Sequence, residues 1–323
     1  MPKSKLLIAI ENNDPTVISA DFSYRKLELA IKLSLIDALK KNTHVTEINL
    51  SQSYFTNEEI ISVIKACPRL KSLIVLHLDL NDSVAIALSQ NCPAFEALHA
   101  YDNHFTGIGI AALSQLPHLK FLDLGLNPVT YDDMSAIAQF PSLQRLYLTG
   151  AKIGDEGARR LSTSQLTELH LGANDLTEKG ALYLSQMKYV KILDLRDNKI
   201  GDEGAAVLTR LKSIETLILA DNGIGDVGAI ALSRIKRLRN LDLSGNDVGD
   251  DGARSFADST LELLILDSNK IGYRGAGALE GNKVTRISLD GNSIGTSWQT
   301  KFHHRSINMI NAEFERAAKQ SKT

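Results

Sequence analysis

The sequence predicts an α/β solenoid of about eleven units, each 23–25 residues long and each supplying one strand to a parallel sheet and one helix. Two observations support this fold class: an apolar pattern ending in asparagine recurs along the chain, and a glycine-rich segment with a short apolar stretch follows each copy. Strands in a sheet lie about 4.8 Å apart, whereas packed helices need about 8–10 Å. We therefore expect the sheet on the concave side and the helices on the convex side.

The repeated pattern reads L-x-x-L-x-L-x-x-N-x-I. Its fourth and sixth residues are apolar with period two, which predicts a strand whose third, fifth and seventh side chains face outward. Asparagine occupies the ninth position in most units, where its short amide can satisfy backbone groups of the turn after the strand. The units begin at Val45, Leu70, Phe95, Leu119, Leu143, Leu166, Val190, Ile214, Leu238, Leu261 and Val284.

The segment after the asparagine often reads Gly-Asp-Glu-Gly-Ala, as at residues 154–158 and 201–205. The first glycine permits a tight turn, and the second lets the start of a helix approach the strand layer. Aspartate is a favoured residue at the start of a helix, so the aspartates of this segment are candidate N-caps. These are Asp155, Asp202, Asp226 and Asp250.

Such units form one continuous stack, because each packs on its neighbours, and the two ends need covers. Residues 1–44 are predicted to be an N-terminal helical cap with a degenerate first repeat, in which Val17, Ala20 and Phe22 reproduce the strand spacing. The repeat stack is predicted over residues 45–297. Residues 298–323 are predicted to be a C-terminal helical cap and tail, with Trp298 and Phe302 covering the last unit.

The charge balance excludes a basic protein, since 36 Lys and Arg face 38 Asp and Glu for a net charge of −2. We therefore expect no nucleic-acid and no membrane partner. The apolar run at residues 6–10 is too short for a signal peptide or a membrane span, and two cysteines fit a reducing, cytoplasmic compartment. Cys67 and Cys92 occupy equivalent positions in neighbouring units, where buried packing is favoured over a disulfide or metal pair.

One set of residues has acid–base character: His99, Asp123, Tyr147 and His170 hold the fifth position of four consecutive units. The two histidines are three units apart, about 14 Å at the strand spacing, which is too far for one metal ion. No neighbouring serine or cysteine supplies a nucleophile. We therefore predict no catalytic residues, no metal and no cofactor, and hence a protein that is not an enzyme.

The outward positions differ between units, so they are the candidates for partner binding. Exposed aromatic residues clustered on a sheet are typical of binding hot spots, and acidic residues outnumber arginines at these positions. The prediction is a monomer that binds a protein partner with a basic and apolar surface; self-association or coverage by the protein's own cap are the alternatives. The candidate residues are Ile74, Leu76, His99, Tyr101, Phe121, Asp123, Arg145, Tyr147, His170, Asp194, Arg196, Asp242 and Asp267.

The repeat units resemble leucine-rich repeats. The Ile-Gly-Asp-Glu-Gly-Ala continuation is similar to the ribonuclease-inhibitor-like class, and the Gly-Ala-x-x-Leu helix starts at residues 180–184 and 228–232 resemble the bacterial GALA-type subgroup. The resemblance implies a horseshoe-shaped protein-binding scaffold, and for the bacterial subgroup an effector delivered into a host cell without a cleaved signal peptide. It also implies three alternatives: a GTPase regulator, an enzyme inhibitor of the ribonuclease-inhibitor type, and a ubiquitin-ligase substrate adaptor. Residues 1–44 hold no recognisable F-box, which argues against the adaptor.

Overall fold

The computed structural model describes residues 4–280 and 283–295. Its contacts group the chain into two compact units, Met1–Asn174 (unit 1) and Asp175–Thr323 (unit 2), which are described separately below. Within the described residues, each repeat contributes a strand of three residues. In every repeat before the last, the fourth-position side chain at the centre of the strand is buried and one helix follows. The predicted C-terminal cap at residues 298–323 lies outside the described residues.

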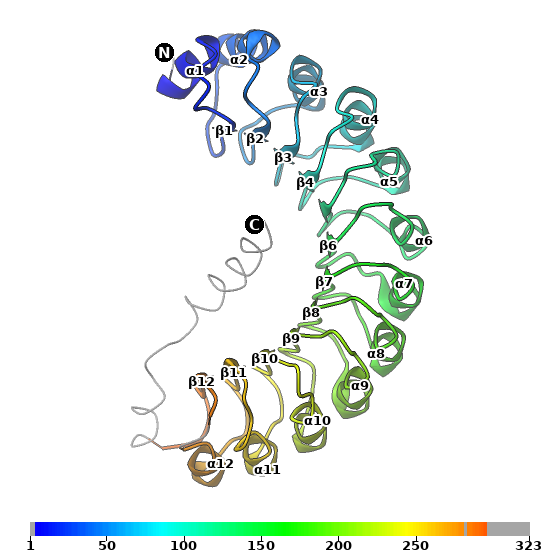
Figure 1. Ribbon diagram of the computed structural model, residues 1–323, viewed down its shortest axis with the longest axis vertical. Coiled ribbons are helices and arrows are strands. Elements are labelled where there is room, and N and C mark those ends of the chain that lie inside the picture. Colours follow the sequence, from blue (N-terminus) through cyan, green and yellow to red (C-terminus); the bar gives the residue numbers. More distant parts are fainter. Residues whose placement is uncertain (1–3, 281–282, 296–323) are drawn as a thin grey trace. The chain divides into compact units, whose positions relative to one another are not determined.

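Unit 1 contains seven parallel strands that pair in chain order, with the helices on one side of the sheet (Figure 1). A strand is present where the degenerate first repeat is predicted, and Ala20 and Phe22 are buried there. The strands are β1 (Ser19–Asp21), β2 (Glu47–Asn49), β3 (Ser72–Ile74), β4 (Ala97–His99), β5 (Phe121–Asp123), β6 (Arg145–Tyr147) and β7 (Glu168–His170). The helices are α1 (Lys5–Glu11), α2 (Leu29–Lys41), α3 (Asn57–Ala66), α4 (Asp82–Asn91), α5 (Gly107–Leu113), α6 (Met134–Ile137) and α7 (Gly154–Leu161).

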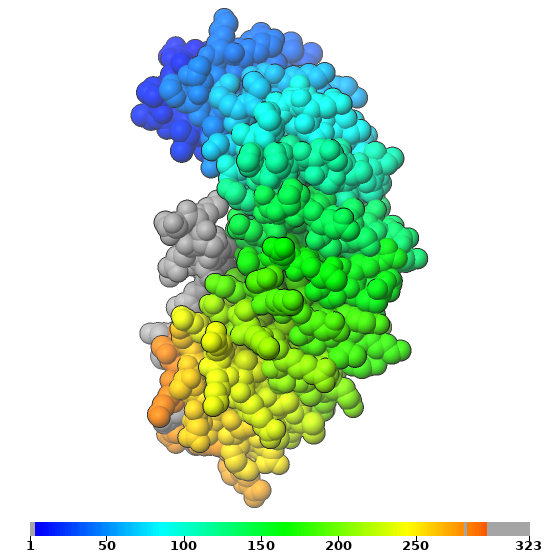
Figure 2. Space-filling view, turned by 45° about the vertical axis from the view of Figure 1, so that its right-hand side comes forward, coloured from blue at the N-terminus to red at the C-terminus, as the bar shows by residue number. Residues whose placement is uncertain are grey.

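Unit 2 repeats the same arrangement, again with parallel strands in chain order and helices on one side (Figure 1). The predicted fold class, an α/β leucine-rich-repeat solenoid, is therefore confirmed. In Figure 2 the colours within each unit follow one another in chain order. The strands are β8 (Ile192–Asp194), β9 (Thr216–Ile218), β10 (Asn240–Asp242), β11 (Leu263–Ile265) and β12 (Arg286–Ser288); the helices are α8 (Glu178–Leu184), α9 (Gly201–Leu208), α10 (Asp226–Leu232), α11 (Asp250–Arg254) and α12 (Tyr273–Ala278).

The ninth-position asparagines join neighbouring repeats, as the pattern predicts. Asn246 is buried, and its Nδ2 donates to the carbonyl of Leu219 in the preceding repeat (2.8 Å) and to that of Leu243 in its own (3.0 Å). Its Oδ1 accepts from the amides of Asn222 (3.0 Å) and Ile224 (2.9 Å). One side chain thus satisfies backbone groups that the short strands leave unpaired. Removing it would leave these groups buried without a hydrogen-bond partner.

The eighth residue of the pattern, just before the asparagine position, has a left-handed backbone in all eleven repeats. This conformation costs an L-residue roughly 1–2 kcal/mol, and glycine, asparagine and aspartate tolerate it best. Leu126, with φ of 52°, is the one large aliphatic side chain in this series of eleven positions. The eleven residues are Gln52, His77, Asp102, Leu126, Gly150, Ala173, Asp197, Asp221, Gly245, Ser268 and Gly291.

The aspartates of the glycine-rich segment do not cap their own helices, which corrects the prediction. Asp226 is the first residue of α10, and its Oδ1 accepts from the amides of Gly249 (2.7 Å) and Gly252 (2.9 Å), which flank the start of α11 in the next repeat. Asp202 and Asp250 bind the following repeat in the same way, whereas Asp155 lies within the first turn of α7. The sequence pattern was correct about the helix starts but assigned Asp202, Asp226 and Asp250 to the wrong helix.

The second glycine of the segment makes room for this bond. A Cβ at Gly252 would lie 2.6 Å from Asp226 Oδ1 and 2.7 Å from Val248 Cγ1. Any larger residue there would therefore push away the aspartate that binds the helix start. This glycine serves the contact between repeats, in addition to the predicted close approach of helix and strand.

Cys67 and Cys92 are both buried, as the packing interpretation expects. Cys92 Sγ donates to the carbonyl of Cys67 (3.7 Å). Burial, with a smaller effect from the neighbouring thiol, raises the pKa of Cys92 to about 12, and burial also raises the pKa of Cys67.

Among the described residues, no helix is both long enough and apolar enough to cross a membrane.

Candidate functional site

A row of four ring side chains crosses strands β4 to β7 on the strand side of unit 1. We call His99, Phe121, Tyr147 and His170 the ring row. The centroids of His99 and Phe121 are 4.1 Å apart and stacked, those of Phe121 and Tyr147 are 5.0 Å apart at 64°, and those of Tyr147 and His170 are 3.9 Å apart. The strand register explains the row, because Phe121 holds a third position on β5 while the other three rings hold fifth positions.

Phe121 is buried, with only 3% of its surface exposed, which corrects the expectation that it faces solvent. The His99 ring covers one side, the Tyr147 ring meets it edge-on, and the Arg145 guanidinium lies 4.9 Å from its centroid. Sequence position alone could not show this, because it depends on how neighbouring side chains lean. The accessible surface of the row is formed by its three half-buried rings, His99, Tyr147 and His170. The neighbouring Arg145 is also half-buried.

Glu168 lies beneath the row and fixes two of its rings. Its carboxylate is buried, accepts a hydrogen bond from the Tyr147 hydroxyl, and lies 3.0 Å from His170 Nε2. Burial alone would raise the pKa of Glu168, but the bonds from His170 and Tyr147 outweigh it and lower that pKa. Burial and the adjacent Glu168 carboxylate raise the pKa of Tyr147. Glu168 was not among the predicted site residues. The available signal was its third position on β7, two residues before His170 and next to the β6 strand that holds Tyr147.

Asp123 is the acid of the predicted acid–base set, and it lies between His99 and Tyr147 in the strand register. Its Oδ1 accepts from the Gly125 amide (3.0 Å). Burial raises the pKa of Asp123 to about 6, although this bond and the charge of His170 partly oppose the rise. The carboxyl therefore changes charge within the range of pH in which cells operate.

A second apolar group, formed by Tyr101 and Leu126, lies where the strands of unit 1 end. The Tyr101 ring lies over Gly125, where a Cβ would come 2.6 Å from Tyr101 Cδ2, and the Leu126 side chain lies against Gly150. Leu126 is 45% exposed, and Tyr101 is half-buried beside His77, which pairs with Asp102 (2.7 Å). Two predicted residues of the adjoining repeat, Ile74 and Leu76, are also half-buried.

The predicted acidic residues of unit 2 are held by their own neighbours. Asp194 is buried and bound by Arg196, whose Nη2 lies 2.8 Å from its carboxylate. Asp242 is also buried and accepts from the amide (2.9 Å) and hydroxyl (2.7 Å) of Ser244. Both carboxylates are therefore buried, whereas the sequence pattern placed them on the outward face.

The other outward positions of unit 2 show the same trend. Ile218, Leu263 and Ile265 are buried as well, whereas Asp267 is half-buried, with burial raising its pKa. The strand side of unit 2 thus offers fewer accessible apolar groups than that of unit 1.

The described residues contain no group of three or more His, Cys, Asp or Glu side chains arranged to hold a metal ion. The Glu168 carboxylate next to the ring row already contacts Tyr147 and His170.

Models of the leucine-rich repeat match residues 188–248 and, separately, residues 115–138, 141–162 and 258–279. These segments are leucine-rich repeats, and the chain has the leucine-rich-repeat fold. Of the solved structures, an internalin (InlF) from Listeria monocytogenes has a TM-score of 0.57 at 17% identity, covering 90% of this chain and 84% of its own. A chain of the mouse RP105/MD-1 complex has a TM-score of 0.56 at 19% identity, covering 80% and 44%. At these identities the likeness shows the fold alone.

Two curated proteins match parts of this leucine-rich-repeat chain. Protein NLRC5 of Mus musculus is 31% identical over 134 residues, which is 37% of this chain and 7% of that protein. Putative F-box/LRR-repeat protein 22 of Arabidopsis thaliana is 31% identical over 97 residues, 28% of this chain and 32% of that protein. The chain thus spans less than a third of either relative.

Proposed function

We propose that this protein is a non-enzymatic scaffold that binds a protein partner through the strand side of unit 1. The observation that supports the proposal is the ring row, in which the half-buried His99 and Tyr147 pack against the buried Phe121 and the half-buried His170 packs against Tyr147. Aromatic groups held rigidly by neighbours lose little entropy on binding, and such groups dominate binding energy at interfaces. The repeat fold supports the same role, since it is typical of protein-binding scaffolds.

The partner is proposed to present an apolar anchor flanked by basic side chains. Tyr101 and Leu126 offer apolar contact, and the exposed Asp102 lies next to Tyr101. Asp123 adds a second carboxyl within the row when it is ionised. Opposite charge at the rim of an apolar contact selects partners and speeds association.

A finer proposal concerns the origin of the protein. The buried Gly180 and Ala181 of α8, like Gly228 and Ala229 of α10, support membership of the GALA-type, ribonuclease-inhibitor-like subgroup. We accordingly propose a bacterial effector that acts in the cytoplasm of a host cell. Fusion to a translocation reporter tests this, because an effector delivers the reporter into host cells and a resident bacterial protein does not.

The binding proposal is tested by selecting a random peptide library displayed on phage against the purified full chain. Peptides with an aliphatic or aromatic anchor next to Lys or Arg are expected. Their affinities are then measured for a face variant combining His99→Ala, Tyr101→Ala and Tyr147→Ala. Each lost hot-spot contact costs about 2 kcal/mol, so binding should weaken at least thirtyfold.

A matched control replaces three exposed apolar residues on helices, Ile108→Ala, Leu182→Ala and Val227→Ala. It should bind the selected peptides as the wild type does. Peptides that bind the face variant and the wild type equally well would refute the assignment of the binding face. Circular dichroism melting of all three proteins separates lost binding from lost folding.

A further inference from the structure

Unit 2 has a concentration of positive charge along the loops that join each helix to the next strand. Three consecutive loops, α8 to β8, α9 to β9 and α10 to β10, hold eight exposed lysines and arginines. Two of them, Lys191 and Arg239, lie within ion-pair distance of glutamates, and the other six form one group. We call this group the basic edge. It consists of Lys188, Arg210, Lys212, Arg234, Lys236 and Arg237.

The lysines of the basic edge are not required by the repeat. Lys188, Lys212 and Lys236 each stand two residues before the first position of their repeat. In unit 1 the same position is mostly proline, and in the following repeat of unit 2 it is serine. These residues are Pro68, Pro93, Pro117, Pro141, Ser164 and Ser259. A position that proline or serine can fill thus holds three like charges in consecutive repeats, where they repel one another.

The charge of the basic edge is not neutralised within the part of the chain that the structure describes. Among those residues, none of its six cations lies within ion-pair distance of an acid. The row of residues beside it differs: Lys191 lies 3.7 Å from Glu215 and Arg239 lies 3.2 Å from Glu262. Lys191 and Arg239 are thus neutralised by glutamates, whereas the cations of the basic edge are not. The excess positive charge is therefore confined to the basic edge.

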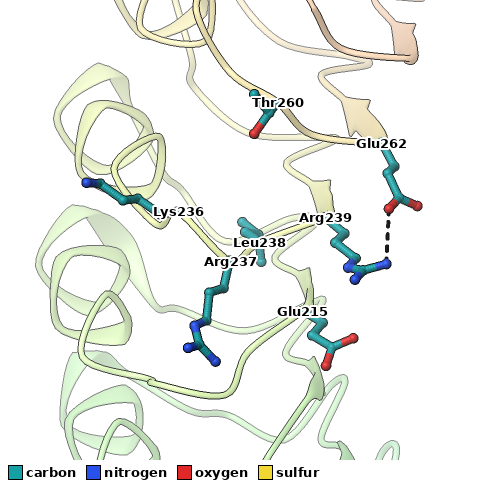
Figure 3. A pocket seen from close by; sticks show the side chains of 7 residues that line it. All are labelled: Glu215, Lys236, Arg237, Leu238, Arg239, Thr260 and Glu262. Carbon is teal, nitrogen blue, oxygen red and sulfur yellow. Dashed lines mark hydrogen bonds and ion pairs between the residues drawn. The ribbon is translucent and has the colours of Figure 1, made fainter.

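A polar pocket lies at one end of the basic edge and is lined by residues of three successive loops. Figure 3 shows Lys236 and Arg237 on the α10–β10 loop, pointing in different directions, with Thr260 on the following loop. The ion pair between Arg239 and Glu262 closes one side, and Glu215 also lines the pocket. Such a pocket offers cationic groups and a hydroxyl to an anionic group.

We infer that the basic edge binds a short acidic segment of a protein partner, at a surface separate from the ring row. Three repeats span about 10 Å along the strand edges, which matches three to four residues of an extended chain. Six cations on three loops form a small binding surface, which suits a short acidic segment; binding of a nucleic-acid strand is an outcome that the probes below decide. Glu215 and Glu262 within the pocket are already paired with Lys191 and Arg239, so they oppose an acidic segment less than unpaired carboxylates would.

The test uses a fluorescein-labelled peptide with six consecutive glutamates, titrated with the full chain in 50 mM NaCl. We expect saturable binding that weakens at least tenfold in 300 mM NaCl, because salt screens exposed charges. The variant Lys188→Glu, Lys212→Glu and Lys236→Glu should lose this binding. A control with the same charge change at exposed lysines elsewhere, Lys5→Glu, Lys152→Glu and Lys179→Glu, should lose less than threefold.

Two further probes decide between classes of partner. A twelve-residue oligothymidylate and vesicles of phosphatidylcholine with 30% phosphatidylserine should bind at least tenfold more weakly than the peptide. Tighter binding of either probe, absence of peptide binding in low salt, or equal loss in both variants would overturn the inference. The face variant should bind the acidic peptide normally, so failure here leaves the ring-row proposal unaffected.

Discussion

The strand sides of the two units use the same framework positions for different chemistry. In unit 1 these positions hold the ring row, with one buried ring and three half-buried rings. In unit 2 they hold buried aliphatic residues and carboxylates that Arg196 and Ser244 already bind. The accessible charge of unit 2 lies instead on its loops, in the basic edge. Because the repeat fixes the backbone and leaves these positions free, one fold can present two unlike surfaces.

The largest expected effect tests whether the framework is shared. Asn127→Ala in unit 1 and Asn246→Ala in unit 2 each leave several buried backbone groups unsatisfied. Each should lower the free energy of unfolding by about 2–4 kcal/mol. Urea denaturation measures this. Asn240→Ala, which removes one bond to Thr216, should cost under about 1 kcal/mol. If Asn127→Ala and Asn246→Ala lowered the free energy of unfolding by very different amounts, the two units would not share the same stabilising framework.

The aspartate bonds between repeats give the next largest effect. Asp226→Ala removes the acceptor for the amides of Gly249 and Gly252, and should cost about 1–3 kcal/mol of unfolding free energy. Asp82→Ala in unit 1 should behave alike, because Asp82 accepts from the amides of Thr106 and Gly109. Asp251→Ala, which affects an exposed pair with Arg254, should change stability little in the same urea titrations. Equal costs for Asp226→Ala and Asp251→Ala would contradict the assignment.

A pH-dependent effect should distinguish the ring row. Because burial raises the pKa of Asp123 from 3.8 to about 6, the folded protein holds this proton more tightly than the unfolded chain does. Its contribution is therefore fully present below about pH 4 and is lost as pH rises through 6. Asp123→Asn should thus stabilise the protein by about 1–3 kcal/mol at pH 7 and by much less at pH 4.5. Thermal melts at both pH values measure this; a constant difference would contradict it.

The smallest effect concerns Leu126, the strained and exposed leucine of unit 1. Leu126→Asn should raise the free energy of unfolding by about 1 kcal/mol, because asparagine tolerates the left-handed backbone. The same change should weaken binding of the selected peptides. At the equivalent position of unit 2, Asp221→Asn should alter neither. Calorimetric melts and peptide titrations check both results, and a destabilised Leu126→Asn that still binds would show that Leu126 serves packing alone.

Most of the fold was predictable, because a period of 23–25 residues and the strand spacing within it specify each element. The asparagine bonds followed from the same pattern. The aspartate bonds did not, because a favoured residue at a helix start does not reveal which helix it binds. The site was predictable only in part: position identified the residues on the strand side, but burial of Phe121 and Asp194 depends on side chains from neighbouring strands and turns. The basic edge becomes visible only when loop positions are compared between repeats.

The most direct test of the central claim compares the proteins captured from a cell lysate by three full-length forms. These are the wild type, the face variant of His99, Tyr101 and Tyr147, and the helix-side control of Ile108, Leu182 and Val227. Quantitative mass spectrometry should find at least one protein that the wild type and the control retain and the face variant loses by more than tenfold. Identical retention by all three forms would contradict a binding face on the strand side of unit 1.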